Sequence, residues 1–476
     1  MFFRQVYDDG LAQASYFIGD ETSGESLVVD PRRDVDVYLR LASRNGLKIT
    51  KAAETHIHAD YLSGGRELAA TAGAPLCVSG EGEVEGGYLR EQPGIDVRLV
   101  RNGDDIAVGR VRARVRYTPG HTPEDICFEI FDANQSPMML LSGDFLFVGD
   151  VGRPDLLEVA LEQAGTAEVG AHALFHSLRS AVRDLPEYIA IWPGHGSGSA
   201  CGKALGAIPS TTLGYERRFS WWSGFVERDD LRGFTRALLE GQPDAPSYFA
   251  RMKHDNRGFT KLLNGLPQPP QLDAATLRNE LAEGAVLIDT RSRAAFCKRH
   301  IKGALSLPDE PSFSVRAPWF VTPRQRIVLL ARPARVSQLV RKLVRVGLDT
   351  IVGFIPDIPT SIKVESLAHV NPAQARQLWS SDRALLVDVR QRSEFASGHI
   401  PHALHVSAGK LLAQLDAIPR DRSLVITCAV GERSVTAASV LRAQGYPDVV
   451  TLEGGFTEWA TLGFPTELDS TISTSA

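Results

Sequence analysis

Apolar residues in the first half of the chain gather in short runs that are separated by polar stretches. Residues 26–30 (SLVVD) read as a short buried strand, and residues 111–117 (VRARVRY) alternate apolar and basic positions with the period of two of a half-exposed strand. Residues 34–45 and 62–72 read as helices, each of which closes at a glycine. Strands in runs with helices interspersed predict a layered αββα sandwich over residues 1–240.

A proline-rich stretch follows this region. Residues 241–271 contain the segments GQPDAP and LPQPPQ. Proline lacks a backbone N–H and fixes its own φ angle, so such stretches interrupt helices and strands. We therefore expect a linker over residues 241–271.

The second half of the chain contains an internal repeat. Residues 285–307 (AVLIDTRSRAAFCKRHIKGALSL) recur as residues 384–406 (ALLVDVRQRSEFASGHIPHALHV), with a constant offset of 99 residues from 285 to 384. Both copies share Asp-x-Arg, Phe, His-Ile and Ala-Leu, and both continue into another strand and helix. A period of this length indicates a duplicated domain. We expect two small parallel-sheet α/β domains over residues 272–362 and 366–470.

Composition narrows the class of protein. A formal net charge of −5 argues against nucleic acid or an acidic membrane surface as the main partner. The start of the chain lacks a basic segment followed by an apolar one, and no run of about 18 apolar residues occurs, so we expect neither a signal peptide nor a membrane span. The five cysteines are odd in number and form no C-x-x-C. This pattern favours reduced thiols and a cytoplasmic location.

The stretch ETHIHADY, residues 54–61, contains the first group of metal-type side chains. Residues alternate sides in an extended segment, so His56, His58 and Asp60 point the same way if the strand geometry persists into the loop. Imidazoles and a carboxylate that converge from one side suit a first-row metal ion.

Three later apolar strands also end in loops with metal-type residues. His121 lies in TPGHT, Asp144 in LSGD and His195 in PGHG. Each residue alone could be a capping aspartate or a surface histidine. Together with ETHIHADY they predict a metal centre at one edge of the sandwich, because loops on a rigid scaffold are where function is placed.

This order of motifs resembles the metallo-β-lactamase fold. The segment GDFLFVGDVGRPD, residues 143–155, resembles the persulfide dioxygenase branch of that fold. The resemblance covers roughly residues 1–240. It implies that His56, His121 and Asp144 hold one Fe(II) per chain and leave open positions for a persulfide and O₂.

The same resemblance suggests roles for nearby residues. Three of them would orient the ligands or bind water: His58, Asp60 and His195. Arg153 could position an anionic persulfide or its carrier, or could form a structural pair with Asp150 or Asp155. Cys201 follows His195 in a glycine-rich loop and could accept a persulfide, or it could be a plain buried thiol.

Tyr61 separates two kinds of chemistry. Two-metal hydrolases of this fold, such as glyoxalase II, carry a histidine at this position, where it helps to hold the second metal. A neutral phenol is a poor ligand near pH 7, since its reference pKa is about 10. Tyr61 therefore favours a mononuclear centre, and the resemblance to persulfide dioxygenases implies that its metal is iron and not zinc. A glyoxalase II-type zinc thioester hydrolase is the alternative, and a scaffold protein with a vestigial metal site is a third possibility.

The second repeat contains a loop with a candidate nucleophile. Cys428 comes directly after the apolar strand LVIT and directly before a helix, in the loop CAVGER. Backbone N–H groups and the positive helix end favour a thiolate there, Gly431 lets the loop curl, and Arg433 adds a positive charge. The loop and the upstream D-x-R and H-I motifs resemble a rhodanese. This implies that Cys428 takes a sulfane sulfur and passes it on.

The first repeat lacks this cysteine. Cys428 corresponds to about Leu330 in the segment LLARPAR, and Pro333 removes an N–H donor from the loop. We therefore expect residues 272–362 to be a degenerate rhodanese domain that carries no sulfur.

Together these features resemble persulfide dioxygenase–rhodanese fusions. The resemblance implies that low-molecular-weight persulfides, linked to glutathione, coenzyme A or a similar thiol, are oxidised with O₂ to sulfite. A sulfane sulfur on Cys428 would then combine with sulfite to give thiosulfate, as part of sulfide detoxification. The resemblance also implies a homo-oligomer. The identity of the carrier thiol and the main direction of sulfur transfer are not readable from the residues.

Overall fold

The computed structural model describes residues 1–468, apart from 83–86, 90, 157 and 159–164. The chain divides into two compact units, which are considered separately. Unit 1 comprises residues 1–266 with 344–347, and unit 2 comprises 267–343 and the chain from 348 onward. Within the described part of the chain, no helix has both the length and the apolar composition needed to cross a bilayer.

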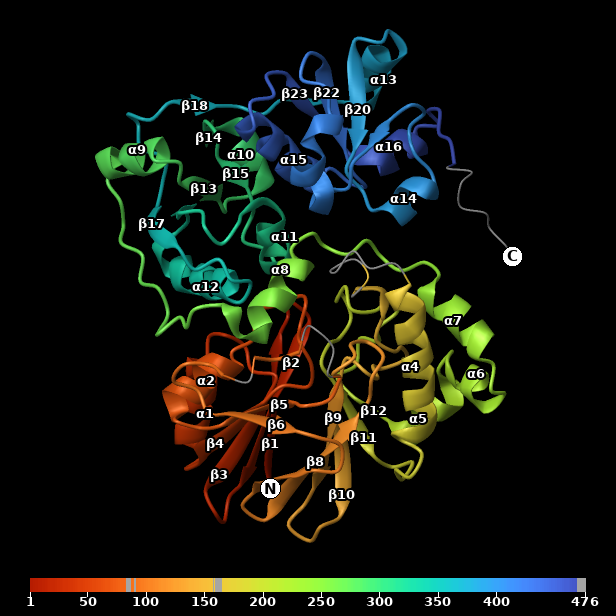
Figure 1. Cartoon of the computed structure of the whole chain (residues 1–476). Helices are drawn as coiled ribbons and strands as arrows, with labels where there is room; N and C mark the ends of the chain where they lie inside the picture. Colours follow the sequence, from red (N-terminus) through yellow and green to blue (C-terminus); the bar gives the residue numbers. More distant parts are fainter. Residues whose placement is uncertain (83–86, 90, 157, 159–164, 469–476) are drawn as a thin grey trace. The chain divides into compact units, whose positions relative to one another are not determined.

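Unit 1 is built on two six-stranded sheets (Figure 1). The first sheet has the order β1-β2-β3-β4-β5-β6: β1 (Phe2–Asp8), β2 (Gln13–Asp20), β3 (Glu25–Val29), β4 (Lys48–Ala53), β5 (Leu76–Ser79) and β6 (Val97–Val100). The second has the order β12-β11-β10-β9-β8-β7: β7 (Asp105–Val108), β8 (Val111–Tyr117), β9 (Ile126–Phe131), β10 (Pro137–Gly143), β11 (Ala190–Pro193) and β12 (Thr211–Thr212).

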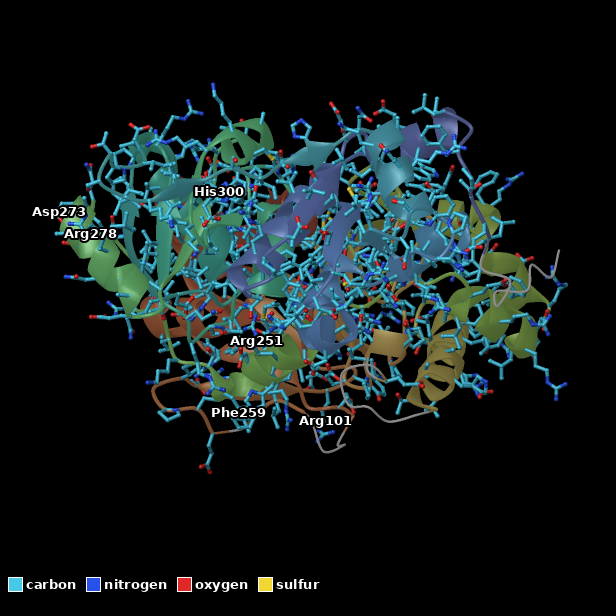
Figure 2. The ribbon with its side chains drawn as sticks, turned by 90° about the horizontal axis from the view of Figure 1, so that it is seen from above. Arg101, Arg251, Phe259, Asp273, Arg278 and His300 are labelled. Atoms are coloured by element: carbon cyan, nitrogen blue, oxygen red, sulfur yellow. The ribbon has the colours of Figure 1, made fainter. Side chains whose placement is uncertain are left out.

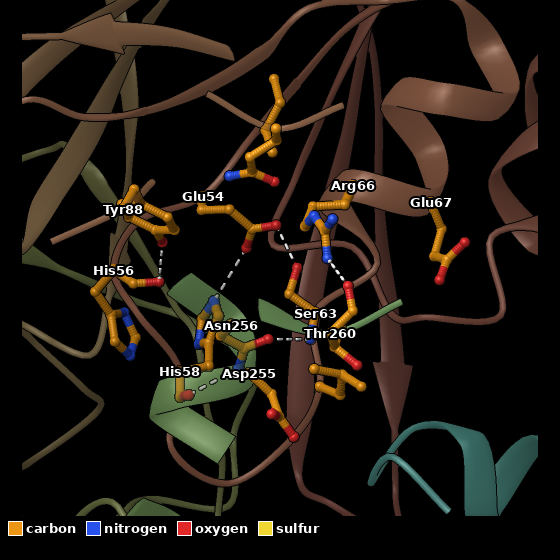
Figure 3. Close-up of a pocket in the computed structure, with 13 residues that line it drawn as sticks. Glu54, His56, His58, Ser63, Arg66, Glu67, Tyr88, Asp255, Asn256 and Thr260 are labelled. Atoms are coloured by element: carbon orange, nitrogen blue, oxygen red, sulfur yellow. Dashed lines mark hydrogen bonds and ion pairs between the residues drawn. The ribbon is translucent and has the colours of Figure 1, made fainter. Parts of the chain in front are cut away.

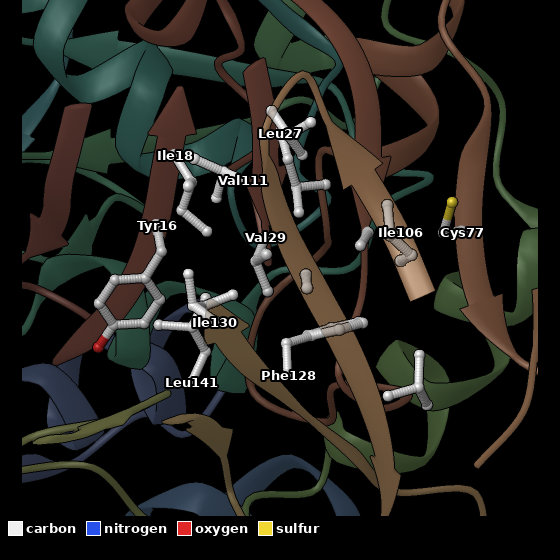
Figure 4. Close-up of a cluster of buried hydrophobic side chains, with 14 of the residues drawn as sticks. Tyr16, Ile18, Leu27, Val29, Cys77, Ile106, Val111, Phe128, Ile130 and Leu141 are labelled. Carbon is white, nitrogen blue, oxygen red and sulfur yellow. The ribbon is translucent and has the colours of Figure 1, made fainter. Parts of the chain in front are cut away.

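The inner faces of the two sheets share one hydrophobic core. Tyr16, Ile18 and Val29 of the first sheet cluster with Phe128 and Ile130 of the second, and all are buried (Figure 4). Side chains alternate along a strand, so the apolar residue at every second position reaches the layer between the sheets.

Helices cover the outer face of each sheet. Two pack on the first sheet through a separate apolar cluster: α1 (Asp36–Arg44) and α2 (Gly65–Ala72). Four provide residues to the cluster on the second sheet: α4 (Thr166–Ser180), α5 (Leu213–Phe219), α6 (Ser223–Glu227) and α7 (Leu231–Leu239). The predicted αββα sandwich is confirmed.

Part of the predicted linker is helical and belongs to unit 1. Helix α8 (Phe249–His254) and a π-helical turn, η1 (Asp255–Phe259), occupy the middle of residues 241–271 (Arg251 and Phe259 are labelled in Figure 2). Phe249 and Met252 are buried, and the Asn256 side chain donates to the carbonyls of His58 and Tyr61, at 2.8 Å each. The prolines lie on either side of this segment. The linker was predicted from these prolines, and that prediction missed the helix between them.

Unit 2 contains the two copies of the repeat. The sheet of the first copy has the order β15-β13-β16-β17: β13 (Val286–Asp289), β15 (Leu305–Ser306), β16 (Ile327–Leu330) and β17 (Ile351–Ile355). The sheet of the second copy has the order β19-β23-β22-β20-β21: β19 (His369–Val370), β20 (Ala384–Asp388), β21 (Leu404–His405), β22 (Ser423–Thr427) and β23 (Val449–Leu452). The paired strands in both sheets are parallel, which confirms the predicted α/β duplication.

The remaining elements of unit 2 flank these sheets. The first copy has α9 (Ala274–Ala282), α10 (Arg293–Lys298), α11 (Phe313–Phe320) and α12 (Pro333–Val344). The second has α13 (Pro372–Ser380), α14 (Arg392–Ala396), the 3₁₀ segment η2 (Ala408–Ala417), α15 (Glu432–Ala443) and α16 (Gly455–Thr461). A two-stranded sheet pairs β14 (His300–Ile301) with β18 (Val364–Glu365).

Candidate metal centre and sulfur-transfer loop

Three of the predicted metal ligands converge in unit 1. His56 follows β4, His121 follows β8, and Asp144 follows β10 directly. Each provides one ligand-type atom, and these atoms lie within 4.8 Å of one another. His56 Nε2 is 3.8 Å and His121 Nε2 is 3.6 Å from Asp144 Oδ2, and all three side chains are at most 1% exposed.

The Nδ1 contacts of His56 and His121 orient each ring so that its Nε2 points toward Asp144. His121 Nδ1 is 2.9 Å from the carbonyl oxygen of Arg153 and can only donate to it. His56 Nδ1 is 3.0 Å from Thr55 Oγ1, which in turn donates to Asp30 Oδ2 at 2.8 Å. Both rings are thus set with hydrogen on Nδ1, which leaves the Nε2 lone pair available to a metal ion.

The two carboxylate oxygens of Asp144 differ in their contacts. Oδ1 lies 2.7 Å from His195 Nδ1, whereas Oδ2 is buried and accepts no hydrogen bond from any described residue. An unsatisfied buried carboxylate oxygen is costly unless a cation reaches it. Two imidazole nitrogens beside this oxygen make a 2-His-1-carboxylate set that fits a divalent first-row metal.

The protonation states suit metal binding. Burial lowers the pKa of His121 to about 4 and that of His56 well below its usual value, so both rings are neutral near pH 7. Burial alone would raise the pKa of Asp144, but the neighbouring His195 and His56 outweigh it and hold that pKa well below its usual range. The set is therefore one carboxylate and two neutral imidazoles.

Gly152 explains part of the motif GDVGRPD. A Cβ at this position would lie 1.8 Å from the Asp144 carbonyl oxygen and 2.9 Å from His121 Cβ. The next residue, Arg153, is buried, and its Nε donates to Asp155 Oδ1 at 2.8 Å. Two roles were considered for Arg153, and its side chain has the contacts expected for a structural pair with Asp155. Its carbonyl oxygen accepts from His121 Nδ1.

His58 and Asp60 do not face the same point as His56. Strand β4 ends at Ala53, so the alternation of an extended segment does not continue through the motif, and the first expectation of a shared direction was wrong. His58 Nε2 instead lies 3.2 Å from Asp30 Oδ1 and 3.3 Å from Glu54 Oε2.

A second group of ligand-type atoms lies next to the first. His195 joins Asp144 on its Nδ1 side, and its Nε2 is 2.8 Å from Asp60 Oδ2. Cys201 Sγ lies within 4.8 Å of a ligand-type atom of Asp60 and of His195. Burial raises the pKa of Cys201 to about 12, and the charges of Asp144 and Asp60 act in the same direction, so the thiol is protonated near pH 7.

Tyr61 remains a neutral phenol. It is fully buried, its hydroxyl donates to the Asp30 carbonyl at 3.3 Å, and it accepts from Gln13 Nε2 at 3.3 Å. Burial raises the pKa of Tyr61 well above its usual value, and the charges of Asp30 and Glu54 add to the shift. A phenol in this state is a poor substitute for a histidine ligand.

The sulfur-transfer loop lies in the second copy of the repeat. Cys428 comes between β22 and α15, and Gly431 N donates to its Sγ at 3.2 Å. Gly431 has φ +92°, a conformation that glycine adopts without strain. Arg433 binds Glu394 through two hydrogen bonds of 2.6 and 2.7 Å, so its charge is shared with this carboxylate.

The corresponding loop of the first copy is shorter. Only residues 331 and 332 separate β16 from α12, whereas residues 428–431 separate β22 from α15. Pro333 is the first residue of α12. A backbone N–H at this position would form no hydrogen bond within the helix, so proline is tolerated there. Within this described loop there is neither a thiol nor the length for a cradle of N–H groups.

Comparison with known proteins identifies both parts of the chain. The model of the metallo-beta-lactamase superfamily matches residues 8–195, and that of the rhodanese-like domain matches residues 273–355 and 371–462. The chain is a metallo-beta-lactamase superfamily member fused to two rhodanese-like domains. The predicted resemblance to persulfide dioxygenase–rhodanese fusions is thereby confirmed, because relatives of both kinds are found.

Three relatives show how far the likeness extends. The fusion is 41% identical to a metallo-beta-lactamase from Staphylococcus aureus subsp. aureus COL, whose crystal structure covers 75% of this chain and 99% of its own, with a TM-score of 0.67. It is 30% identical over 197 residues to the mitochondrial persulfide dioxygenase of Mus musculus, covering 40% of this chain and 67% of the relative. It is 40% identical over 91 residues to a sulfurtransferase of Allochromatium vinosum, covering 19% of this chain and 85% of the relative.

The fusion also places a lysine at the metal centre that sequence reasoning missed. Lys253 of α8 is only 8% exposed, and its ammonium forms no hydrogen bond with a described residue. Burial lowers the pKa of Lys253, while the charges of Glu124 and Asp144 act against this. The buried apolar residues of α8 could have revealed the helix, but nothing local in the sequence connects it with the metal loops.

A small cavity adjoins His56 and His58. It has a volume of about 20 Å³ and is closed on one side by Tyr88, whose hydroxyl donates to the His56 carbonyl at 2.6 Å (Figure 3). Asn256 and Ser63 line another part of it. This volume holds about one water molecule, so the cavity is too small for a thiol carrier.

Proposed function

We propose that the fusion oxidises low-molecular-weight persulfides with O₂ and passes a sulfane sulfur through Cys428. One persulfide, one O₂ and one water would give the free thiol, sulfite and two protons. One observation supports this proposal most strongly. Asp144 Oδ2 has no hydrogen-bond partner among the described residues, and it faces the Nε2 atoms of His56 and His121. The name of the Mus musculus relative, a persulfide dioxygenase, supports the same activity.

His56, His121 and Asp144 would hold the metal in this proposal. Fe(II) bound to a 2-His-1-carboxylate face supplies the redox chemistry that reaction with O₂ requires. Tyr61 supports a single metal, because its neutral phenol is already bound to Asp30 and Gln13. His195 would position Asp144 through the contact of 2.7 Å.

Lys253 and Cys201 would act on the substrate side. A persulfide near neutral pH carries negative charge on its terminal sulfur. The ammonium of a largely buried lysine that has no hydrogen-bond partner among the described residues is suited to offset that charge. A pocket of about 260 Å³ borders His195 on another side and is lined by Tyr7, Ile208 and Pro209. We propose this pocket as space for the thiol carrier, and Cys201 as a residue that contacts the persulfide.

Metal content and O₂ uptake on one preparation test the main proposal. We expect iron near one per chain and O₂ consumption when glutathione persulfide or coenzyme A persulfide is added. The comparison of these two substrates also identifies the preferred carrier. Iron-loaded protein that consumes no O₂ with either persulfide would refute the proposal.

One observation favours a second candidate function. Asp60, His195 and Cys201 form another ligand-type group directly beside Asp144, which is the arrangement that a two-metal centre would use. A zinc thioester hydrolase of glyoxalase II type would then be the alternative activity. Two zincs per chain together with hydrolysis of a glutathione thioester would support this candidate and exclude the first.

Lys253 provides a more specific prediction. Replacing Lys253 with methionine keeps the length and apolar body of the side chain but removes its charge. We expect the KM for a persulfide to rise at least about tenfold, since a hydrogen bond to a charged group contributes about 1.5–3 kcal/mol. Iron content should stay unchanged. The exposed Lys261 of the same segment provides the control, and Lys261→Met should leave KM unaltered.

A further inference from the structure

Two arginines of the first copy lie at the start of the helix that follows the Cys428 loop. Arg293 Nε donates to the Glu432 carbonyl at 3.2 Å, and Arg316 Nη2 is 3.8 Å from Glu432 Oε2. Glu432 is the first residue of α15 and directly precedes Arg433. The degenerate copy thus brings positive charge next to the nucleophile loop of the second copy.

The first and second copies of the repeat pack directly against each other. Helix α15 lies against β15 of the first copy, where Ser306 N donates to Ser439 Oγ at 3.0 Å and Thr436 Oγ1 donates to the Ser306 carbonyl at 2.8 Å. These three side chains are buried. The buried hydroxyls of Thr436 and Ser439 thus bond to the backbone of Ser306, and these bonds hold α15 against β15.

The two arginines differ in how their charge is compensated. Arg293 binds Glu310 through two hydrogen bonds of 2.7 and 2.6 Å. Arg316 reaches Glu310 and Glu432 only at 4.0 and 3.8 Å, which is beyond hydrogen-bond distance. Its side chain is 17% exposed, and the carboxylate of Glu432 is 52% exposed and can turn into solvent.

The electrostatic surroundings of Arg316 point to an anion. Burial lowers the pKa of Arg316, and the positive charges of Arg293 and Arg433 lower it further. Arg433 also lies within electrostatic range of Cys428. Three guanidinium groups therefore gather around the start of α15. Arg293 and Arg433 each form two hydrogen bonds with a carboxylate, whereas Arg316 forms none with any described carboxylate.

We propose that Arg316, assisted by Arg293, binds the small sulfur oxyanion that reacts at Cys428. The ligand is a dianion of the sulfite or thiosulfate class, because a guanidinium offers paired N–H donors that match the oxygens of an oxyanion. The first copy would then form the substrate-binding wall of the second copy. This inference rests on the proposed role of Cys428 as sulfur carrier.

The chemistry at this site requires no further oxidant or reductant. The sulfur lone pair of sulfite attacks the outer sulfur of the Cys428 persulfide and forms the S–S bond of thiosulfate. The S–S bond to Cys428 breaks, and Cys428 leaves as a thiolate with that electron pair. In the reverse direction the thiolate attacks thiosulfate and releases sulfite. Arg316 would bind the same oxyanion oxygens in both directions.

Sulfur transfer by the Arg316→Gln protein provides the first test. The full-length protein is loaded with a Cys428 persulfide, and transfer to sulfite is compared with transfer to dithiothreitol, an uncharged acceptor. We expect the KM for sulfite to rise about tenfold, with kcat and the rate with dithiothreitol unchanged. Arg316→Lys should restore part of the affinity. Arg326→Gln is the control, because the Arg326 side chain binds Glu280 and Glu283, which belong to the same copy.

Direct binding provides a test that does not depend on sulfur transfer. Sulfite and thiosulfate are titrated separately into full-length Cys428→Ser protein by calorimetry, with and without Arg316→Gln. Loss of about tenfold in affinity for at least one oxyanion supports the proposal and identifies the ligand. Unchanged affinity for both, or an equal loss of transfer to dithiothreitol, would overturn it. Normal oxyanion binding without any sulfur transfer in the parent protein would instead count against the proposed role of Cys428.

Discussion

Replacing Asp144 with alanine is expected to remove the metal and abolish O₂ consumption. Asp144 provides the only carboxylate in the group with His56 and His121, and its buried Oδ2 has no other partner among the described residues. Loss of residues that merely orient a metal ligand reduces affinity by about 10–100-fold, so loss of the ligand itself should cost at least about 100-fold. Iron content by elemental analysis and O₂ uptake with a persulfide measure the two effects.

Two further variants separate the loss of a ligand from damage to the fold. Asp144→Asn keeps the shape and leaves an acceptor for His195, but it removes the negative charge, so it should also lose most of the iron. Asp184→Asn is the control, since Asp184 is an exposed partner of Arg116 on the surface of the same unit. Retention of iron and O₂ uptake in Asp144→Ala would mean that the metal is held elsewhere or that the site is vestigial.

Replacing Cys428 with serine is expected to eliminate sulfur transfer and leave O₂ consumption intact. A serine hydroxyl forms no persulfide, and loss of a covalent nucleophile reduces turnover by about a thousandfold or more. The products with a persulfide and O₂ should then shift from thiosulfate to sulfite. Both anions are measured by chromatography in the same reaction.

Cys297 offers the matched control for this experiment. It is a partly exposed free thiol in the first copy, and Cys297→Ser should keep both activities. Thiosulfate formed by Cys428→Ser at the rate of the parent protein would show that sulfur does not pass through Cys428. A parallel fall in O₂ uptake would contradict the assignment of the two reactions to separate sites.

Several parts of the metal centre could be predicted because their signals are local. His121, Asp144 and His195 each lie within four residues of the end of a strand, and such strand ends place the following loop at a sheet edge. The direction of His58 could not be predicted in this way. It depends on the carboxylates of Asp30 and Glu54, and Asp30 lies 28 residues earlier in the chain.

The duplication in unit 2 was also visible in the sequence, whereas the relation between its copies was not. The recurring Asp-x-Arg and His-Ile motifs give the fold of each copy, because they mark equivalent strands and loops. Arg293 and Arg316 have no motif of their own, and their proximity to Glu432 arises from the packing of α15 on β15. Lys253 was missed for a similar reason, since a helix between prolines brings it to the metal loops.

The two-residue loop of the first copy has a consequence for any attempt to change its role. A cysteine introduced at residue 331 or 332 would face a helix that begins immediately afterward at Pro333, without the four-residue span that surrounds Cys428. Regaining a sulfur carrier would require an insertion as well as a substitution, so no single codon change could reverse the loss. A designer who wants two carriers should therefore graft a whole loop into the first copy.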